Sequence, residues 1–285
     1  MSYTTIQEIM KGESNMLKQR IPSGVMLAVM VVAILLLSGS PLVMKCVSVF
    51  LSMMSAWELC RTGGYLQNKA FAFGCFAVSA LLAICAEAVF AGPLLIAAFL
   101  GALYLMKHMQ KIQKLPEGLI LLVAAFCGYF FGLLDALRSQ EAGFLLLTVA
   151  ILIPVITDIG AYCFGRAFGK HKLAPVISPK KTWEGSVGGT ACTLTALTAG
   201  ALVLKHLSLV QAPMRLFVVY LLVGSAISQI GDLTFSSLKR IAGIKDYGTL
   251  NPGHGGILDR FDSLLFVIPF TVFMNRYFGP LLTAA

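Results

Sequence analysis

The sequence contains few charged residues for its length. Asp, Glu, Lys and Arg make up 12% of the 285 residues, whereas a soluble domain carries about 25%. Hydrophobic residues make up 58% of the chain, and the mean hydropathy is +0.84. This composition argues against an ordinary soluble domain and indicates a protein built mainly from membrane-spanning segments.

Several common site motifs are also missing. The seven cysteines form no C-x-x-C pair and no zinc-finger spacing with histidine, so we interpret them as small packing residues. There is no G-x-x-x-x-G-K-[ST] phosphate loop, no G-x-S-x-G elbow and no H-E-x-x-H pair. The net charge of +9 is interpreted as basic loops on one side of a bilayer, and no nucleic-acid partner is expected.

Long apolar runs dominate what is present. A helix needs about 20 apolar residues to cross the hydrocarbon core, and nine segments are candidates. Their approximate cores are 24–37, 42–59, 70–88, 91–106, 119–134, 144–164, 185–204, 216–231 and 263–278. We therefore expect an all-α, polytopic transmembrane bundle with about nine spans.

The distribution of Lys and Arg predicts the orientation of these spans. If the N-terminus lies inside, 17 of the 22 basic residues fall in inside segments, as the positive-inside rule requires. This pattern predicts an N-in/C-out topology. It also predicts two parts, an N-terminal cytoplasmic extension over residues 1–20 and a single membrane-embedded domain over residues 21–285.

Acidic residues are scarce but clustered. Only 13 are present, and four of them, Asp232, Asp246, Asp259 and Asp262, lie within 31 residues. A helix dipole would account for one acid near a helix start, but not for four. Carboxylates combined with substrate phosphates are typical ligands of Mg²⁺, so Asp232 and Asp259 are candidate metal ligands. Asp158, within a predicted span, is either a structural hydrogen-bonding residue or part of the same site.

Basic residues accompany these acids. Lys239, Arg240 and Lys245 lie in the same stretch, and a second group occurs in the segment Ser178–Thr182, which contains Lys180 and Lys181. That segment is expected to form a loop that enters a helix, where free N–H groups could hold phosphate. A mixture of cations and carboxylates suits triphosphate chemistry. His254 could be a ligand, a base or a turn residue.

The run from Ser236 to Asp262, SSLKRIAGIKDYGTLNPGHGGILDRFD, resembles the signature of the phosphatidate cytidylyltransferase family. The upstream segments SPKKTWEG, from Ser178, and DIGAYCFGRAFGKHKLAP, from Asp158, are also similar to blocks of that family. The resemblance covers roughly the C-terminal half of the chain. Asn251 departs from it, because an apolar residue usually precedes the proline.

The resemblance implies transfer of a cytidylyl group from CTP to phosphatidic acid, with release of pyrophosphate. It implies active-site segments 158–185 and 231–262, with Mg²⁺ and a second cation, K⁺ or Mg²⁺, held by Asp232 and Asp259. The catalytic residues it implies are Lys239, Arg240, Lys245, Asp246, His254, Arg260 and Asp262. Phosphate or CTP contacts are assigned to Ser178, Lys180, Lys181 and Thr182, and a homodimer is expected from the resemblance alone.

Both polar segments fall on the predicted inside face, where cytosolic CTP and a lipid headgroup can meet. The expected location is therefore the plasma or inner membrane, with the active site facing the cytoplasm. An ion-coupled transporter is the main alternative, because it too combines many spans with embedded acids. A CDP-alcohol phosphotransferase is a second alternative, but the sequence lacks the D-G-x-x-A-R motif of that family, and no motif of a polyprenyl-phosphate sugar transferase is found.

Overall fold

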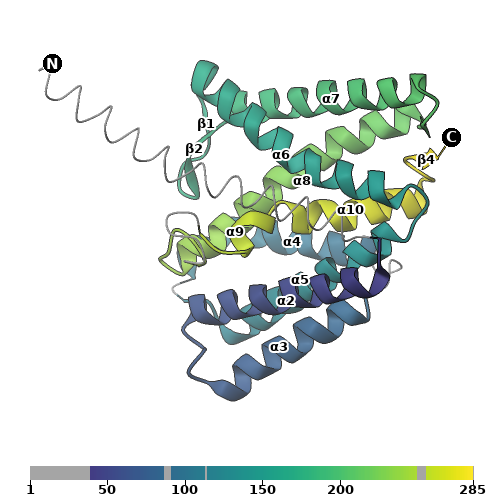
Figure 1. Ribbon diagram of the computed structural model, residues 1–285. Coiled ribbons are helices and arrows are strands. Elements are labelled where there is room, and N and C mark those ends of the chain that lie inside the picture. Colours follow the sequence, from purple (N-terminus) through teal and green to yellow (C-terminus); the bar gives the residue numbers. More distant parts are fainter. Residues whose placement is uncertain (1–38, 87–90, 113, 249–254, 285) are drawn as a thin grey trace, which may run out of the picture.

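The computed structural model describes residues 39–86, 91–112, 114–248 and 255–284 (Figure 1). The helices are α2 (Pro41–Gly63), α3 (Lys69–Ile84), α4 (Ala91–His108), the 3-10 turn η2 (Met109–Lys111), α5 (Glu117–Arg138), α6 (Gly143–Phe168), α7 (Trp183–His206), α8 (Met214–Ile241), α9 (Leu258–Phe261) and α10 (Leu264–Tyr277). Four short strands complete this part of the chain: β1 (Lys172–Ala174), β2 (Ser178–Thr182), β3 (Val210–Gln211) and β4 (Thr283–Ala284).

The described part of the chain is nearly all helical, as expected, apart from these four short strands. Among the described residues, six helices are long and apolar enough to cross a bilayer: α2, α4 with η2, α5, α6, α7 and α8. Helices α3 and α10 occur where spans were expected but have only 16 and 14 residues, short of the roughly 20 that a straight span needs. The first expected span, 24–37, and the extension 1–20 lie outside the described residues, so the total of nine spans stays a prediction.

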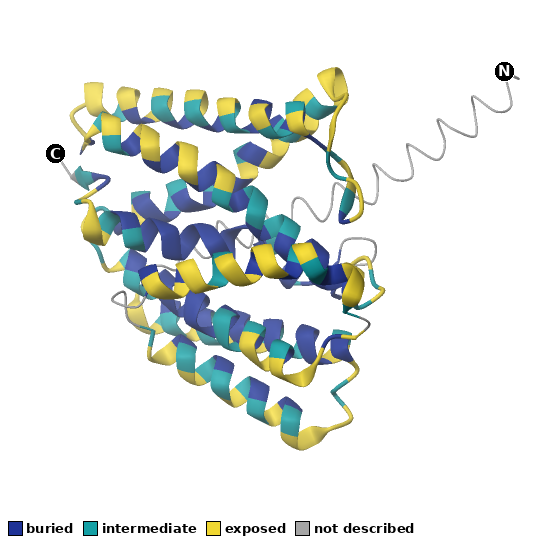
Figure 2. Ribbon diagram, turned by 180° about the vertical axis from the view of Figure 1, so that it is seen from behind, coloured by how far each residue is buried: buried dark blue, intermediate teal, exposed yellow. Residues whose placement is uncertain are grey.

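Helix α10 forms the centre of the bundle. It packs against α4, α5, α6 and α8, and its residues from Leu264 to Val272 are all buried. Figure 1 shows α6, α7 and α8 to one side of it and α2, α3 and α5 to the other. Figure 2 shows the same contrast in burial, with dark blue along α10 and much yellow on the peripheral helices. The exposed apolar side chains of those helices suit contact with lipid.

Glycines allow α6 and α7 to approach closely. A Cβ atom at Gly185 would lie 2.7 Å from the Ala161 carbonyl oxygen, and one at Gly189 would lie 2.4 Å from that of Thr157. This spacing is the small-residue pattern by which helices pack in membranes. The close approach fixes the position of the hairpin that connects the two helices.

That hairpin is a departure from the sequence-based expectation. Residues 178–182 were expected to form a loop, but they form strand β2, which pairs antiparallel with β1. The pairing satisfies backbone groups that an irregular loop would leave to water. Helix α7 then begins directly after the strand, capped by the Thr182 hydroxyl, which accepts a hydrogen bond from the Gly185 N–H at 3.2 Å.

Candidate active site

Polar side chains from distant parts of the chain gather at one end of the bundle. The β1–β2 hairpin and α9 both lie toward this end in Figure 1, whereas β4 lies toward the other. The hairpin is linked to α8 by Arg240, whose Nε donates to the Ile177 carbonyl oxygen at 3.1 Å. The two segments expected to form the site, 158–185 and 231–262, are therefore in contact.

Asp232 on α8 lies where these segments meet. Its carboxylate accepts a hydrogen bond from the Ser236 hydroxyl at 3.1 Å, and the Lys181 ammonium of β2 forms an ion pair with it. Asp158 on α6 is close enough to interact with Asp232 electrostatically. Two acids and a lysine from three elements thus share one polar environment.

A cavity of about 230 Å³ adjoins this cluster. Asp158, Lys180 and Lys181 line it, together with Thr182 and Gln229. Lys180 is exposed, so its ammonium is available to a ligand at the mouth of the cavity. The lining provides both cations and hydrogen-bonding groups, as a phosphate-bearing ligand requires.

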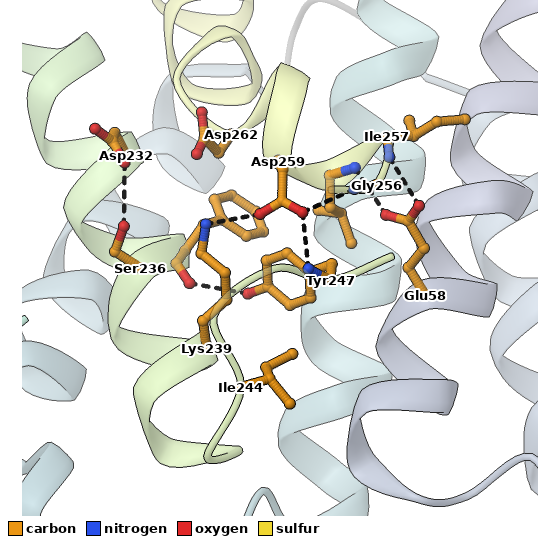
Figure 3. Close-up of polar contacts among 12 residues, drawn as sticks. Glu58, Asp232, Ser236, Lys239, Ile244, Tyr247, Gly256, Ile257, Asp259 and Asp262 are labelled. Atoms are coloured by element: carbon orange, nitrogen blue, oxygen red, sulfur yellow. Dashed lines mark hydrogen bonds and ion pairs between the residues drawn. The ribbon is translucent and has the colours of Figure 1, made fainter. Parts of the chain in front are cut away.

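Asp259 on α9 is held tightly. Its Oδ1 accepts from the Lys239 Nζ at 2.7 Å, and its Oδ2 accepts from the backbone N–H groups of Tyr247 at 2.7 Å and Gly256 at 2.8 Å (Figure 3). A carboxylate has about four acceptor positions, so these bonds leave Oδ1 with room for one more partner. Lys239 is itself buried in this arrangement, with its Nζ 5.5 Å from the centre of the Tyr247 ring.

Asp262 is drawn between Asp232 and Asp259 in Figure 3. It is buried, and its carboxylate accepts a hydrogen bond from the Ser263 N–H at 2.6 Å. Burial and the negative charge of Asp232 together raise the pKa of Asp262 well above its ordinary value, although Lys239 partly offsets this. A cation bound between Asp232 and Asp262 would lower the pKa of Asp262.

Tyr247 closes the inner side of the cluster. Its hydroxyl donates to the Phe235 carbonyl oxygen at 3.0 Å, and burial holds the pKa of the phenol well above its ordinary value. The side chain therefore stays neutral and acts as a fixed hydrogen-bond donor. It joins the loop after α8 back onto that helix.

Glu58 on α2 is a contributor that the sequence analysis did not assign to the site. Its buried carboxylate accepts the backbone N–H groups of Ile257 at 2.7 Å and Leu258 at 2.8 Å, at the start of α9 (Figure 3). Gly256 permits this approach, because a Cβ there would lie 2.2 Å from the Glu58 Oε1. The only available signal was an acid near the end of an apolar run.

The remaining predicted residues lie in different surroundings. Arg240 braces the fold, because besides its bond to Ile177 it donates to the Ile244 carbonyl oxygen at 3.1 Å. Lys245 and Asp246 are exposed, Arg260 and Ser178 are half-buried, and Thr182 caps α7. His254 lies outside the described residues. No contact to a ligand follows from these positions alone, so the roles assigned to them stay predictions.

The acids fit a magnesium ion that substrate phosphates help to bind. Among the described residues no group of three or more His, Cys, Asp or Glu side chains is close enough to hold a metal unaided. Mg²⁺, however, is commonly bound by one or two carboxylates together with substrate phosphates and water. Asp232 beside Asp262, and the remaining acceptor position of Asp259, provide oxygen ligands of this kind.

Comparison with known proteins agrees with these observations. Residues 18–278 match the model of the cytidylyltransferase family. Proteins named phosphatidate cytidylyltransferase from Staphylococcus saprophyticus, Staphylococcus epidermidis and Staphylococcus aureus are each 40% identical to this chain, over 172, 173 and 174 residues. Each match covers 60% of this chain and 64% of the relative, so the chain spans less than two thirds of the length of these curated relatives.

Proposed function

The chain belongs to the cytidylyltransferase family, and from this premise we propose that it transfers a cytidylyl group from CTP to phosphatidic acid. A phosphate oxygen of phosphatidic acid attacks the α-phosphorus of CTP. A new P–O–P linkage forms, the bond to the leaving pyrophosphate breaks, and CDP-diacylglycerol and pyrophosphate are the products. The names of the relatives supply the substrates of this proposal.

One observation carries the proposal. Two lysines of β2 line a cavity that adjoins Asp232, which itself lies beside Asp262 at the end of a bundle of apolar helices. Transfer of a nucleotidyl group needs cations for the phosphate oxygens and acids for a metal, and little covalent chemistry from the protein. A site for both CTP and a lipid phosphate also has to lie at the end of membrane helices.

The residues divide the work by position. Lys180 and Lys181 bind the phosphates of CTP and neutralise charge that develops on the leaving pyrophosphate. Asp158 and Gln229, on the wall of the same cavity, orient the nucleotide. Lys239, fixed by Asp259, neutralises a phosphate oxygen at the opposite side of the cluster. Arg240 holds the hairpin, and with it both lysines, against α8.

Mg²⁺ would be held by Asp232 and Asp259, with Asp262 as a third oxygen donor, and K⁺ or a second Mg²⁺ would complete the pair. When bound, such an ion polarises phosphoryl oxygens and neutralises their charge. In this arrangement Lys181 and Lys239 hold the acids in place before the substrates arrive. Substrate phosphates would complete the coordination.

The membrane placement belongs to the same proposal. We infer about nine spans, with the N-terminus inside, the C-terminus outside and the site facing the cytoplasm, from the distribution of Lys and Arg. The bacterial relatives favour the plasma membrane. A homodimer is proposed from the resemblance to the family alone.

The proposal is tested by supplying purified protein with phosphatidic acid and CTP labelled at the α-phosphate. Labelled lipid should form with Mg²⁺ and not with EDTA. Asp232→Asn should reduce the rate by at least about a hundredfold, because an electrostatic contact in the transition state is removed. Asp135→Asn is the matched control, since Asp135 pairs with Lys45 near the opposite end of α2 from Glu58.

A folded wild type that makes no labelled lipid under any metal tested would contradict the enzyme proposal and favour the transporter alternative. If the wild type is active and Asp232→Asn retains full activity, the reaction stands and the assigned metal site is wrong. The first result tests the reaction itself, and the second tests the assignment of Asp232 to the metal site.

A further inference from the structure

The cavity that Lys180 and Lys181 line also contains an amide side chain, that of Gln229 on α8. Gln229 precedes Asp232 by one helical turn, so the two side chains project from the same side of α8. In the proposed reaction the two lysines bind the phosphates of CTP. Gln229 is therefore placed to contact the nucleoside part of the same molecule.

The amide of Gln229 is fixed by hydrogen bonds at both of its polar atoms. Its Oε1 accepts from the Ser186 hydroxyl, and its Nε2 donates to the Thr190 hydroxyl at 3.2 Å and to the Ser186 carbonyl oxygen at 3.4 Å. Thr190 donates its only proton to that same carbonyl oxygen at 3.1 Å, so it can only accept from the amide. These contacts determine which end of the amide is the nitrogen.

A chain of hydroxyl groups holds Thr190 in turn. Its Oγ1 lies 3.0 Å from the Ser225 Oγ, which lies 3.0 Å from the Thr157 Oγ1, and Thr157 lies 2.8 Å from the Thr193 Oγ1. Ser225, Thr157 and Thr193 are fully buried, and the chain joins α6, α7 and α8. Turning the amide over would leave buried polar groups unpaired, which is costly. Its orientation is therefore set before a ligand arrives.

The fixed amide can accept a hydrogen bond from a ligand but cannot donate one. Within the described part of the chain, Thr190 and the Ser186 carbonyl oxygen occupy both N–H groups of the amide. The Ser186 hydroxyl occupies one of the two acceptor positions of Oε1, which leaves the other for a ligand. Cytosine carries an amino group, a donor, where uracil carries a carbonyl oxygen, an acceptor. Such an amide attracts the first base and repels the second.

The other walls of the cavity suit a flat base without distinguishing one pyrimidine from another. Tyr162 of α6 lines it and is 64% exposed, so its ring is available for stacking. Leu173 of β1 and Ala161 of α6 add apolar surface. Asp158 adds a second acceptor when it is ionised. The choice between cytosine and uracil therefore falls to the polar groups, of which Gln229 is the one with a fixed orientation.

We propose that Gln229 selects cytosine over uracil by accepting a hydrogen bond from the 4-amino group of the base at its Oε1. Thr190 is the positioning residue that holds the amide in this orientation. The inference rests on the proposed function and adds to it the residue and the atom that read the base. A site built to bond a polar group of its substrate discriminates strongly against an analogue that lacks this group.

The test measures kcat/KM for CTP and for UTP, with dioleoyl phosphatidic acid as the second substrate. Gln229→Met keeps the length of the side chain but has no carbonyl oxygen. It should lower the ratio of the CTP value to the UTP value by at least about tenfold, as expected when one buried polar group loses its partner. Equal losses with both nucleotides, or an unchanged ratio, would overturn the assignment although the transfer itself had been demonstrated.

Thr190 tests the orientation of the amide separately, because it is not among the residues that line the cavity. Thr190→Val removes the acceptor of Nε2 and should also lower the CTP-to-UTP ratio, whereas Thr190→Ser keeps the hydroxyl and should restore it. Thr195→Val on the same helix is the matched control, since the exposed Thr195 bonds only to backbone carbonyl oxygens of α7. Elution volume and Tm verify that each variant is folded. An unchanged ratio in Thr190→Val would overturn the positioning role.

A binding measurement keeps the inference testable even if the wild type transfers no label. Purified protein is equilibrated with labelled CTP and Mg²⁺, and unlabelled CTP or UTP is added as the competitor. UTP should compete at least about tenfold more weakly than CTP for the wild type, and about equally with CTP for Gln229→Met. Equal competition by the two nucleotides for the wild type, or no binding of CTP, would overturn the inference.

Discussion

Glu58 illustrates how a single buried carboxylate can hold a site without belonging to its chemistry. Both oxygens accept backbone N–H groups at the start of α9, the short helix that carries Asp259. Charge-assisted hydrogen bonds of this kind are stronger than neutral ones. The position of Asp259 therefore depends on a side chain of α2, about 200 residues earlier in the sequence.

Replacing that carboxylate by an amide should loosen α9. In Glu58→Gln, the side-chain NH₂ group would face a backbone N–H of Ile257 or Leu258, so at least one of the two hydrogen bonds is lost. The free energy of unfolding should fall by about 1.5–3 kcal/mol. We expect a lower Tm and a lower rate of cytidylyl transfer. Glu117→Gln, at an exposed acid of α5, should change neither. Wild-type activity and Tm in Glu58→Gln would contradict the role of Glu58 in positioning α9.

Asp262 gives a prediction about pH. Its pKa is raised in the folded protein, so above about pH 4, where a free Asp ionises, the metal-free folded state binds more protons than the unfolded chain. The free energy of unfolding should then fall as the pH rises toward the raised pKa. In Asp262→Asn, the free energy of unfolding should decrease less as the pH rises.

The measurement is unfolding in EDTA over a series of pH values. Asp135→Asn serves as the control and should keep the wild-type slope, because Asp135 lies away from this cluster beside Lys45. A wild-type stability that does not decline over this range would contradict the raised pKa of Asp262, which burial and the charge of Asp232 cause.

At the scale of elements, the contact between α8 and the β1–β2 hairpin decides whether the two halves of the site face each other. Arg240 crosses it with its Nε, which donates to the Ile177 carbonyl oxygen, while its Nη1 donates to the Ile244 carbonyl oxygen in the loop after α8. Lysine keeps the charge but lacks the planar fork of donors. The role of Arg240 in the fold is thus distinct from any contact that it makes with phosphate.

Arg240→Lys should therefore raise the KM for CTP several-fold while changing kcat little, because the hairpin lysines are less well positioned. Arg215→Lys, at the exposed opposite end of the same helix, should behave as wild type. Steady-state kinetics with varied CTP make the comparison. A large fall in kcat with unchanged KM would instead indicate that Arg240 contacts the reacting phosphates.

Apolar runs in the sequence predicted the helices well, but not the short elements that carry the site. Residues 178–182 contain no alternating apolar pattern, so nothing local indicated strand β2, which depends on pairing with β1. Helix α9 has four residues and is held by a contact from α2. Local pattern could make Asp232 and Asp259 candidates, but only the fold could add Glu58 and pair Lys239 with Asp259.

For the whole molecule, the distribution of Lys and Arg along the chain predicts the orientation in the membrane. The positive-inside pattern puts Lys245 on the cytoplasmic face and Lys205 on the other. In a cysteine-free background, Lys245→Cys should react with a membrane-impermeant maleimide in inside-out vesicles only. Lys205→Cys should react in right-side-out vesicles only. The reverse pattern would overturn the N-in topology.

The contact between Glu58 and Leu258 joins residues 200 positions apart. During synthesis, the Glu58 carboxylate of α2 cannot gain these backbone partners until residues 257 and 258 have been translated. A ribosome that stops early therefore releases a product with an unsatisfied buried acid and no assembled site. Formation of α9 is therefore the step at which the Glu58 carboxylate gains its partners and Asp259 is placed in the site.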